Sequence, residues 1–426
     1  MQNLVLCKRL WLTMAATTLL ATIVASPLKR ISPEKAGMIQ GQLGKADSAI
    51  QDAISREIIP GAVLAVVRHG RMAYLKAYGN RQVWPTKEPM HTNVVFDMAS
   101  CSKAMSTAIS TLILCEQGAI RLQDAVNLYL PDFEDWTNKN GERKTIRISH
   151  LLTHTSGLPA YTSATDLQKK HGAPCPDALL SYICHAKRGF EPEKGFRYSC
   201  LNYIVLQRII EKVSGTSLRE FAQRHIFTPL EMHHTDYLPC APNASGIWEN
   251  TVLPVWAKNN DKVEEWKRIV APTTQQKDGT LLQAMVHDPL ARLINGGISG
   301  NAGLFSNAED IAVFCAMLQN GGEWKGVRIL SRQGVALLRT VPDFAKEYGR
   351  TYGWDNCSPY ASCNGDLFSA ATYSHTGFTG TSIVIDPVAD CSVILLTHAV
   401  HPSEGKSVVR LRSIVSNAVA ASLTKE

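Results

Sequence analysis

Ser100 and Lys103, three positions apart, are the residues of this sequence best placed for covalent chemistry. They follow a predicted loop over residues 96–99 and begin an apolar stretch that is predicted to be helical as far as Gln117. Side chains at positions i and i+3 of a helix share one face and can touch. A serine hydroxyl becomes an effective nucleophile when a neighbouring base takes its proton. We expect burial to lower the pKa of Lys103 and so to make its amine that base.

The spacing by itself is weak evidence, because the chain contains five Ser-x-x-Lys strings, which begin at Ser26, Ser32, Ser100, Ser403 and Ser422. A chain of this length and composition is expected to contain about one or two such strings by chance. Context favours Ser100, because a serine at the start of a long helix meets the positive end of the helix dipole, which stabilises developing negative charge. The alternative interpretation is an N-capping serine followed by a solvated lysine.

Two other stretches supply side chains that can take part in acyl chemistry. Tyr198 stands just before a helix predicted over residues 203–214, and His375 stands at the start of a predicted strand. Taken singly, Tyr198 is typical of a packed aromatic residue and His375 of a surface histidine. Their order in the chain after Ser100 and Lys103 makes a pattern of three motifs, which is more specific than any one of them.

These motifs resemble those of the serine β-lactamase/penicillin-binding-protein superfamily, on the side of the class C β-lactamases, D-alanyl-D-alanine carboxypeptidases and esterases. The resemblance runs from residue 32 to the C-terminus, with further similar stretches at residues 148–159, 226–236 and 302–310. It implies an α/β (α+β) fold, in which an antiparallel sheet built from both termini is flanked by helices and carries an inserted all-helical lobe.

The resemblance also implies the catalytic roles. Ser100 attacks a carbonyl carbon, while Lys103 and Tyr198 share the proton transfers. The backbone N–H groups of Ser100 and Phe378 form the oxyanion hole, a role for which the side chain at position 378 matters little.

The substrate-binding residues implied by the resemblance are Cys200, His375, Thr376 and Gly377. His375 stands where a lysine is usual and is expected to contact a substrate carboxylate or the Tyr198 hydroxyl. Cys200 departs from the family, which has Asn or Asp at this position, and a thiol is too weak a hydrogen-bonding group to hold a substrate amide. This departure counts against turnover of β-lactams and D-Ala-D-Ala peptides, whereas the groups needed for acyl transfer are all present.

The N-terminus has the pattern of a secretory signal peptide. Lys8 and Arg9 precede an apolar run over residues 10–25, and small residues follow before Pro27. We therefore expect residues 1–25 to be a signal peptide and the protein to be exported, to the periplasm or the extracellular space. An uncleaved N-terminal anchor is the alternative. No other segment reaches the 18 or so apolar residues that a membrane span requires, so we expect no stable insertion after cleavage.

The remaining chain, residues 26–426, is expected to be one hydrolase domain. Strands are predicted near both ends, with helices between them. A sheet lobe is accordingly expected at residues 30–95 and 296–426, and a helical lobe at residues 96–295. The predicted elements include helices over residues 42–57, 307–318 and 407–420, a hairpin over residues 62–78 turning at His69 and Gly70, and strands over residues 381–387 and 392–397.

Composition limits the partners. The formal net charge is +7, without long runs of Lys or Arg, so there is no electrostatic footprint for nucleic acid. The histidines lack the spacing of metal ligands, and we expect no metal and no cofactor. The expected partner is a small-molecule or peptidoglycan-peptide substrate.

Disulfides are permitted in an exported protein. Cys357 and Cys363 flank a predicted turn and are the pair expected to form a bridge if any bridge exists, whereas Cys115 and Cys315 lie in apolar helical runs and are expected to be free thiols.

The sequence therefore predicts an exported serine hydrolase that forms an acyl-Ser100 intermediate, resembling D-alanyl-D-alanine carboxypeptidases or esterases. Two alternatives remain open. One is a β-lactamase of the class C type, and the other is a non-catalytic penicillin-binding module that retains the fold.

Overall fold

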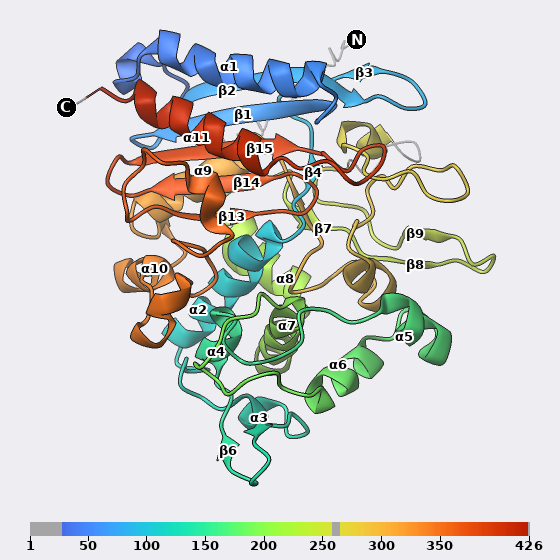
Figure 1. Cartoon of the computed structure of the whole chain (residues 1–426). Helices are drawn as coiled ribbons and strands as arrows, with labels where there is room; N and C mark the ends of the chain where they lie inside the picture. Colours follow the sequence, from blue (N-terminus) through green and yellow to red (C-terminus); the bar gives the residue numbers. More distant parts are fainter. Residues whose placement is uncertain (1–27, 258–264, 425–426) are drawn as a thin grey trace, which may run out of the picture.

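Strands from both ends of the chain form one antiparallel sheet in the computed structural model, which describes residues 28–257 and 265–424. The order of its six strands is β13-β14-β15-β1-β2-β3 (Figure 1). They are β1 (Gly61–Arg68), β2 (Arg71–Gln82), β3 (Glu88–Pro89), β13 (Tyr373–Thr376), β14 (Ser382–Asp386) and β15 (Cys391–Thr397). β1 pairs with β15 along its whole length. The predicted sheet built from both termini is confirmed.

The predicted hairpin is formed by β1 and β2. His69 and Gly70 at its turn have φ values of 52° and 63°, and positive φ at both central residues is typical of the tight turns whose twist matches that of antiparallel strands. All eight residues of β1 are buried. A strand buried on both faces lies inside the molecule, with further layers packed on each side of it.

Helices supply those layers. Alternate residues of β1 point to opposite faces, so Val66 belongs to an apolar cluster with Ile50 and Val415, while Val67 belongs to another with Phe314. The first cluster lies under α1 (Gln40–Ser55) and α11 (Val409–Ser422), which Figure 1 shows against the same side of the sheet. The second lies toward α9 (Ala308–Gln319) and the middle of the chain.

The middle of the chain is largely helical and lies below the sheet in Figure 1. Its main elements are η2 (Lys103–Ala108, a π-helical turn), α2 (Ile109–Glu116), α3 (Val126–Tyr129), α4 (Ile148–Leu152), α5 (Ala164–His171), α6 (Pro176–His185), α7 (Cys200–Ser214), α8 (Leu218–Ala222) and η3 (Gln223–Phe227). The segment also holds short strands: β5 (Trp136–Thr137), β6 (Arg143–Lys144), β8 (Cys240–Pro242) and β9 (Trp248–Asn250).

A second, three-stranded sheet joins the middle segment to the C-terminal part. It consists of β4 (Phe96–Asp97), β10 (Leu304–Ser306) and β7 (Asp236–Tyr237), in that order. Its central strand β10 begins just after residue 301, and β4 ends just before residue 100. This small sheet therefore brings two distant segments together beside Ser100.

The remaining described elements are short turns, hairpins and one helix. They are η1 (Glu34–Ala36), η4 (Glu265–Ile269), η5 (Leu290–Ile294), β11 (Glu323–Trp324), β12 (Val327–Arg328), α10 (Arg332–Arg339), η6 (Asp343–Tyr348) and η7 (Ala361–Asn364). Within the described ranges, no helix is both long and apolar enough to cross a bilayer. The predicted signal peptide at residues 1–25 lies outside those ranges.

Cys357 and Cys363, the pair expected if any bridge exists, are both free thiols in this structure. Cys357 is exposed, whereas the helical turn η7 directs Cys363 into the interior, where its Sγ lies 3.1 Å from the Ser374 Oγ on β13. Proximity along the chain suggested the pair, but the turn sends the two side chains to different environments. Cys115 and Cys315 are free, as predicted.

Replacing Cys357 by Ala should change the free energy of unfolding by no more than about 0.5 kcal/mol, the range for exposed positions without a specific contact. Cys363→Ala should cost more, because it removes a buried side chain. The measurement is urea unfolding of each variant with and without a thiol reductant. Equal losses of about 2–5 kcal/mol in both variants, which removal of a native disulfide causes, would show that the bridge exists.

Candidate active site

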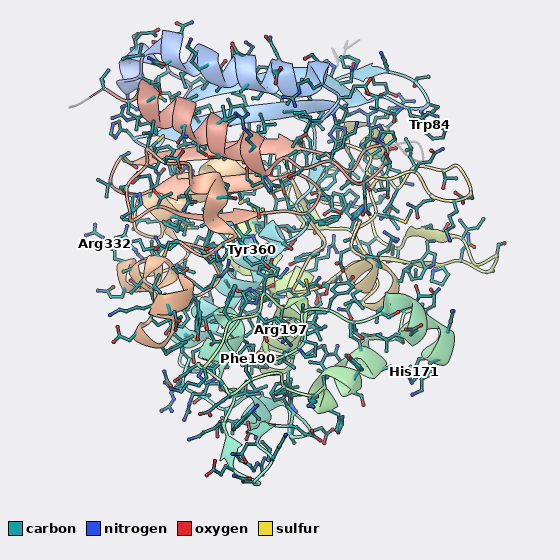
Figure 2. The ribbon with its side chains drawn as sticks, in the orientation of Figure 1. Trp84, His171, Phe190, Arg197, Arg332 and Tyr360 are labelled. Atoms are coloured by element: carbon teal, nitrogen blue, oxygen red, sulfur yellow. The ribbon has the colours of Figure 1, made fainter. Side chains whose placement is uncertain are left out.

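A pocket of about 380 Å³ opens where the main sheet meets the helical segment. Tyr360 lies at this junction in Figure 2 and is one of the lining residues. The pocket brings together Ser100 and Tyr198 with the end of β13 and the start of α11, as its lining shows: Ser100, Tyr198, Arg350, Asp355, Tyr360, His375, Thr376, Gly377, Phe378, Lys406, Ser407, Val408, Val409 and Arg412. Most of the residues that the sequence predicted to act together are therefore found in one place.

Ser100 follows a strained turn that a buried carboxylate holds in place. Ala99 has a φ of 44°, which is uncommon for a residue with a side chain. The N–H groups of Ala99 and His287 donate to the two carboxylate oxygens of Asp97, at 2.8 and 2.7 Å. Such strain persists only where surrounding contacts determine the conformation. Here these contacts present the Ser100 hydroxyl to the pocket.

Lys103 is fully buried, and its ammonium group contacts the nucleophile. Nζ donates to Ser100 Oγ at 3.0 Å and to the backbone oxygen of Asn301 at 2.8 Å. It also lies 3.6 Å from Cys200 Sγ and 5.0 Å from the centre of the Tyr198 ring. Helical spacing predicted the contact with Ser100, while the contact with Asn301 depends on the small sheet.

The expected lowering of the Lys103 pKa is wrong. Burial opposes the charge, but the ionised forms of Cys200 and Tyr198 favour it, and the net result is a raised pKa for Lys103. Burial raises the pKa of Tyr198 as well, although Lys103 acts in the opposite direction. A proton must leave the Lys103–Tyr198 pair before it can accept one from Ser100. Both raised pKa values place that loss on the alkaline side of neutrality.

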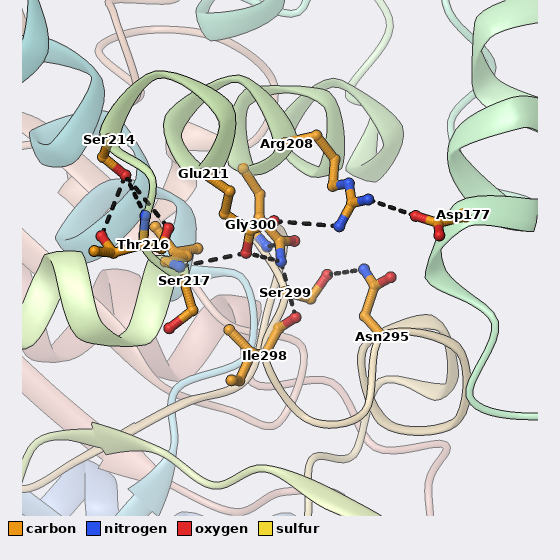
Figure 3. Close-up of polar contacts among 12 residues, drawn as sticks. Asp177, Arg208, Glu211, Ser214, Thr216, Ser217, Asn295, Ile298, Ser299 and Gly300 are labelled. Carbon is orange, nitrogen blue, oxygen red and sulfur yellow. Dashed lines mark hydrogen bonds and ion pairs between the residues drawn. The ribbon is translucent and has the colours of Figure 1, made fainter.

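The carbonyl oxygen that holds Lys103 belongs to a segment tied to α7 (Figure 3). Gln207 on α7 accepts from the Gly300 N–H at 2.9 Å and donates to the Ile298 oxygen at 3.1 Å. A side chain at position 300 would not fit, because a Cβ there would lie 2.0 Å from the backbone oxygen of Tyr203. This close approach of two backbones sets the position of Asn301.

Tyr198 packs against a histidine to which the sequence assigned no role. The rings of Tyr198 and His154 are 4.5 Å apart, and His154 Nδ1 accepts a hydrogen bond from the Ser199 N–H at 3.1 Å. Burial lowers the pKa of His154 well below its ordinary value, so the ring is neutral. His154 lies in the family-like stretch at residues 148–159, which was the only signal that could have found it.

His375 is also neutral, and this decides which contacts it can make. Burial lowers its pKa well below the ordinary value, helped by the positive charges of Arg350 and Lys103. Its Nδ1 lies 3.0 Å from the Thr376 carbonyl oxygen, which can only accept, so Nδ1 carries the proton. Nε2 therefore presents a lone pair, with no hydrogen-bond partner among the described residues. It cannot donate to a substrate carboxylate, but it can accept from a hydroxyl.

The oxyanion-hole donors are free to act. Neither the Ser100 N–H nor the Phe378 N–H makes a hydrogen bond within the described part of the chain. A Cβ at Gly377 would lie 2.6 Å from the Met98 oxygen, so glycine is needed for the turn after β13 to approach the residues before the nucleophile. The Phe378 side chain is 66% exposed and stacks on His287 at 5.6 Å.

Cys200 opens α7 with its thiol toward Lys103 rather than along the pocket wall. Asn202 points elsewhere, as predicted, because its amide is engaged by Ser156 and His154. Asn202 therefore does not supply an amide in place of the one that the family's Asn carries. Across the described ranges, no cluster of three or more His, Cys, Asp or Glu side chains could hold a metal ion.

Three cationic residues of the pocket were not predicted: Arg350, Lys406 and Arg412. Arg412 Nη2 donates to the backbone oxygens of Gly377 and Thr381, at 2.7 and 2.9 Å. Arg350 and Arg412 belong to no motif, and Lys406 ends the Ser-x-x-Lys string that begins at Ser403, to which the sequence assigned no role. The fold alone places them here.

Comparison with known proteins agrees with this geometry. The beta-lactamase family model matches residues 46–415. The chain is 30% identical over 395 residues to an "N-acetylmuramyl-L-alanine amidase" of Bacillus subtilis, covering 88% of this chain and 84% of that protein. It is 28% identical over 404 residues to a "Putative D-alanyl-D-alanine carboxypeptidase" of Escherichia coli K12, covering 92% and 90%.

Solved structures show the same fold. EstCE1, described as a hydrolase with promiscuous acyltransferase activity, superposes with a TM-score of 0.67 at 22% identity, covering 89% of this chain and 99% of that chain. A class C beta-lactamase from Rhodobacter sphaeroides superposes with a TM-score of 0.63 at 18% identity, with the same coverage of both chains.

Replacing Gly300 by Ala should lower both the melting temperature and kcat for ester hydrolysis, because a Cβ displaces the segment that holds Lys103. Gly44→Ala is the matched control. Gly44 lies in helix α1 with open space around its Cα, and this change should stabilise the protein by about 1 kcal/mol. Thermal melts give the melting temperature of each variant, and ester hydrolysis gives its kcat. Unchanged kcat in Gly300→Ala would contradict the positioning role of this segment.

Proposed function

This chain belongs to the beta-lactamase family, and from that membership we propose that it is a serine hydrolase that works through an acyl-Ser100 intermediate. One observation carries the proposal, which is that the buried Lys103 ammonium contacts the Ser100 hydroxyl at 3.0 Å beside the Tyr198 ring. A nucleophile in hydrogen-bond contact with a basic group, which a third side chain helps to orient, is the arrangement that acyl transfer needs.

The geometry supports a two-step reaction. Ser100 Oγ attacks the substrate carbonyl carbon, and its proton passes to the deprotonated Lys103–Tyr198 pair. The carbonyl oxygen becomes an oxyanion that the N–H groups of Ser100 and Phe378 stabilise. The pair then returns the proton to the leaving group as its bond to carbon breaks. Water releases the acyl group from Ser100 by the same steps.

We propose peptidoglycan-derived peptides or small esters as substrates. Two relatives that match most of the chain are named an N-acetylmuramyl-L-alanine amidase and a D-alanyl-D-alanine carboxypeptidase, both names of peptidoglycan chemistry. The name of a structural neighbour, EstCE1, describes a hydrolase with acyltransferase activity, which favours an esterase-like reaction. The apolar run at residues 10–25 supports export to the compartment where peptidoglycan lies.

Two alternatives are less well supported. A β-lactamase would need a group to hold the amide beside the scissile bond, and Cys200 offers only a thiol directed at Lys103. A non-catalytic binding module would not need to keep Ser100, Lys103 and two unoccupied oxyanion donors in working geometry.

Replacing Ser100 by Ala should abolish hydrolysis of p-nitrophenyl acetate and covalent labelling by fluorescent penicillin, without changing the melting temperature. Ser403→Ala is the control, since Ser403 begins another Ser-x-x-Lys string but is exposed. It should keep full activity and labelling. Labelling that persists at another residue in Ser100→Ala would overturn the assignment of the nucleophile.

Replacing Cys200 by Asn should raise kcat/KM for a cephalosporin or a D-Ala-D-Ala peptide several-fold, and less for p-nitrophenyl acetate. One restored hydrogen bond is worth about 0.5–1.5 kcal/mol, and only the amide substrates can form it. Cys200→Ala removes the thiol without adding an amide and separates the two effects. Equal changes on both substrates, or losses on both with a lower melting temperature, would reject a substrate contact at position 200.

A further inference from the structure

Strand β13 offers no positive charge to the reacting groups. This chain has His375 on the strand, and the neutral ring leaves Nε2 buried, without a hydrogen-bond partner among the described residues. Tyr198 is nevertheless expected to pass through its anionic form while it moves protons. A phenolate in a buried site is costly unless positive charge lies nearby. Lys103 supplies one such charge, because its Nζ lies 5.0 Å from the centre of the Tyr198 ring.

Arg350 supplies a second positive charge from a loop that the motifs do not include. It lies between η6 and β13 and is only 1% exposed. Its Nη1 donates to Asp355 Oδ2 at 2.7 Å, and the N–H and hydroxyl of Ser358 donate to the same carboxylate. Its Nε and Nη2 have no hydrogen-bond partner among the described residues. The ion pair with Asp355 therefore engages Nη1 alone and leaves Nε and Nη2 of Arg350 without an acceptor among the described residues.

The guanidinium is directed at Tyr198. Its central carbon lies 5.6 Å from the centre of the Tyr198 ring, and its charge acts to lower the pKa of Tyr198. The same charge helps to keep His154 and His375 neutral. The negative charge of the Asp355 carboxylate acts to raise the pKa of Cys363, which lies in η7. Arg350 thus presents its guanidinium to Tyr198, and Asp355 lies beside it in the lining of the pocket.

We propose that Arg350 is a positioning residue whose guanidinium supplies the positive charge on the β13 side of Tyr198, in place of the charge that His375 lacks. During acylation the proton leaves Ser100 Oγ for the Tyr198 oxygen and passes on to the leaving group. Arg350 stabilises the phenolate that accepts this proton and makes no contact with substrate. The inference rests on the proposed acyl-serine chemistry.

Other groups around Tyr198 do not account for this role. Among the described residues packed against the ring, Lys103 is the one other cation, and it already holds Ser100 and Asn301. The remaining polar or titratable neighbours are uncharged or, when ionised, negative: Ser100, His154, Cys200, Tyr360 and His375.

The test is the pH profile of kcat/KM for p-nitrophenyl acetate, a substrate without charge. The variant is Arg350→Gln with Asp355→Asn, because removing Arg350 alone would leave an unpaired buried carboxylate. The rising limb of the profile, which reports loss of the proton from the Lys103–Tyr198 pair, should move to higher pH by about one unit, since an opposite charge within about 4–6 Å lowers a pKa by 1–3 units. Arg350→Lys keeps the charge and should keep the midpoint close to wild type.

Arg208→Gln with Asp177→Asn is the control, another Arg–Asp ion pair, which joins α7 to α6 (Figure 3) and whose residues are not among those that line the pocket. Its profile should not move. A lower melting temperature with an unmoved midpoint in the Arg350/Asp355 variant would overturn the inference, because it shows a structural role alone. A midpoint in Arg350→Lys that moves as far as in the neutral variant would also overturn it.

A second readout does not depend on activity. Titration of ¹³Cζ-labelled tyrosine, with the Tyr198 resonance identified by its loss in Tyr198→Phe, follows ionisation directly in the Ser100→Ala background. The Tyr198 midpoint should rise in the neutral variant. If the wild-type protein lacks Ser100-dependent hydrolysis but this shift occurs, the proposed function fails and the placement of the Arg350 charge stands. An unmoved resonance overturns the inference whatever the activity.

Discussion

The contact between the Lys103 ammonium and the Ser100 hydroxyl is the interaction on which the rest of the site depends. A buried ammonium is costly unless it is hydrogen-bonded, and here its acceptors are Ser100 Oγ and the Asn301 backbone oxygen. These acceptors lie 201 positions apart in the chain. The small sheet of β4, β10 and β7 brings them together, and Gln207 on α7 fixes the segment that contains Asn301.

Burial opposes the positive charge of every basic group around this contact, and the neighbours of each group decide the outcome. His154 and His375 are kept neutral by burial and by the cations near them, whereas the ionised forms of Cys200 and Tyr198 act against burial and raise the pKa of Lys103. The site therefore concentrates positive charge around one phenol and leaves the histidines to act through lone pairs and packing. Tyr198 is the group best able to carry a proton between Ser100 and a leaving group.

Much of the fold was predictable because its signals are local. The hairpin turn at His69 and Gly70, the helix at residues 200–214 and the adjacent strands near the C-terminus follow from periodicity and turn chemistry. The environments of the two C-terminal cysteines were not predictable from the same kind of signal. Cys357 and Cys363 are close in sequence, but a helical turn directs one of them inward.

The sequence by itself determined which of the predicted site residues the chain carries, in which order, and on which kind of element, because residue identity and local periodicity are written in the chain. Only the tertiary structure decided their charge states and their partners. The acceptor for Lys103 is a backbone carbonyl, which no residue type marks, and Arg350 belongs to no motif. A pKa depends on burial and on the charges within a few ångströms, and these come from segments far apart in the sequence.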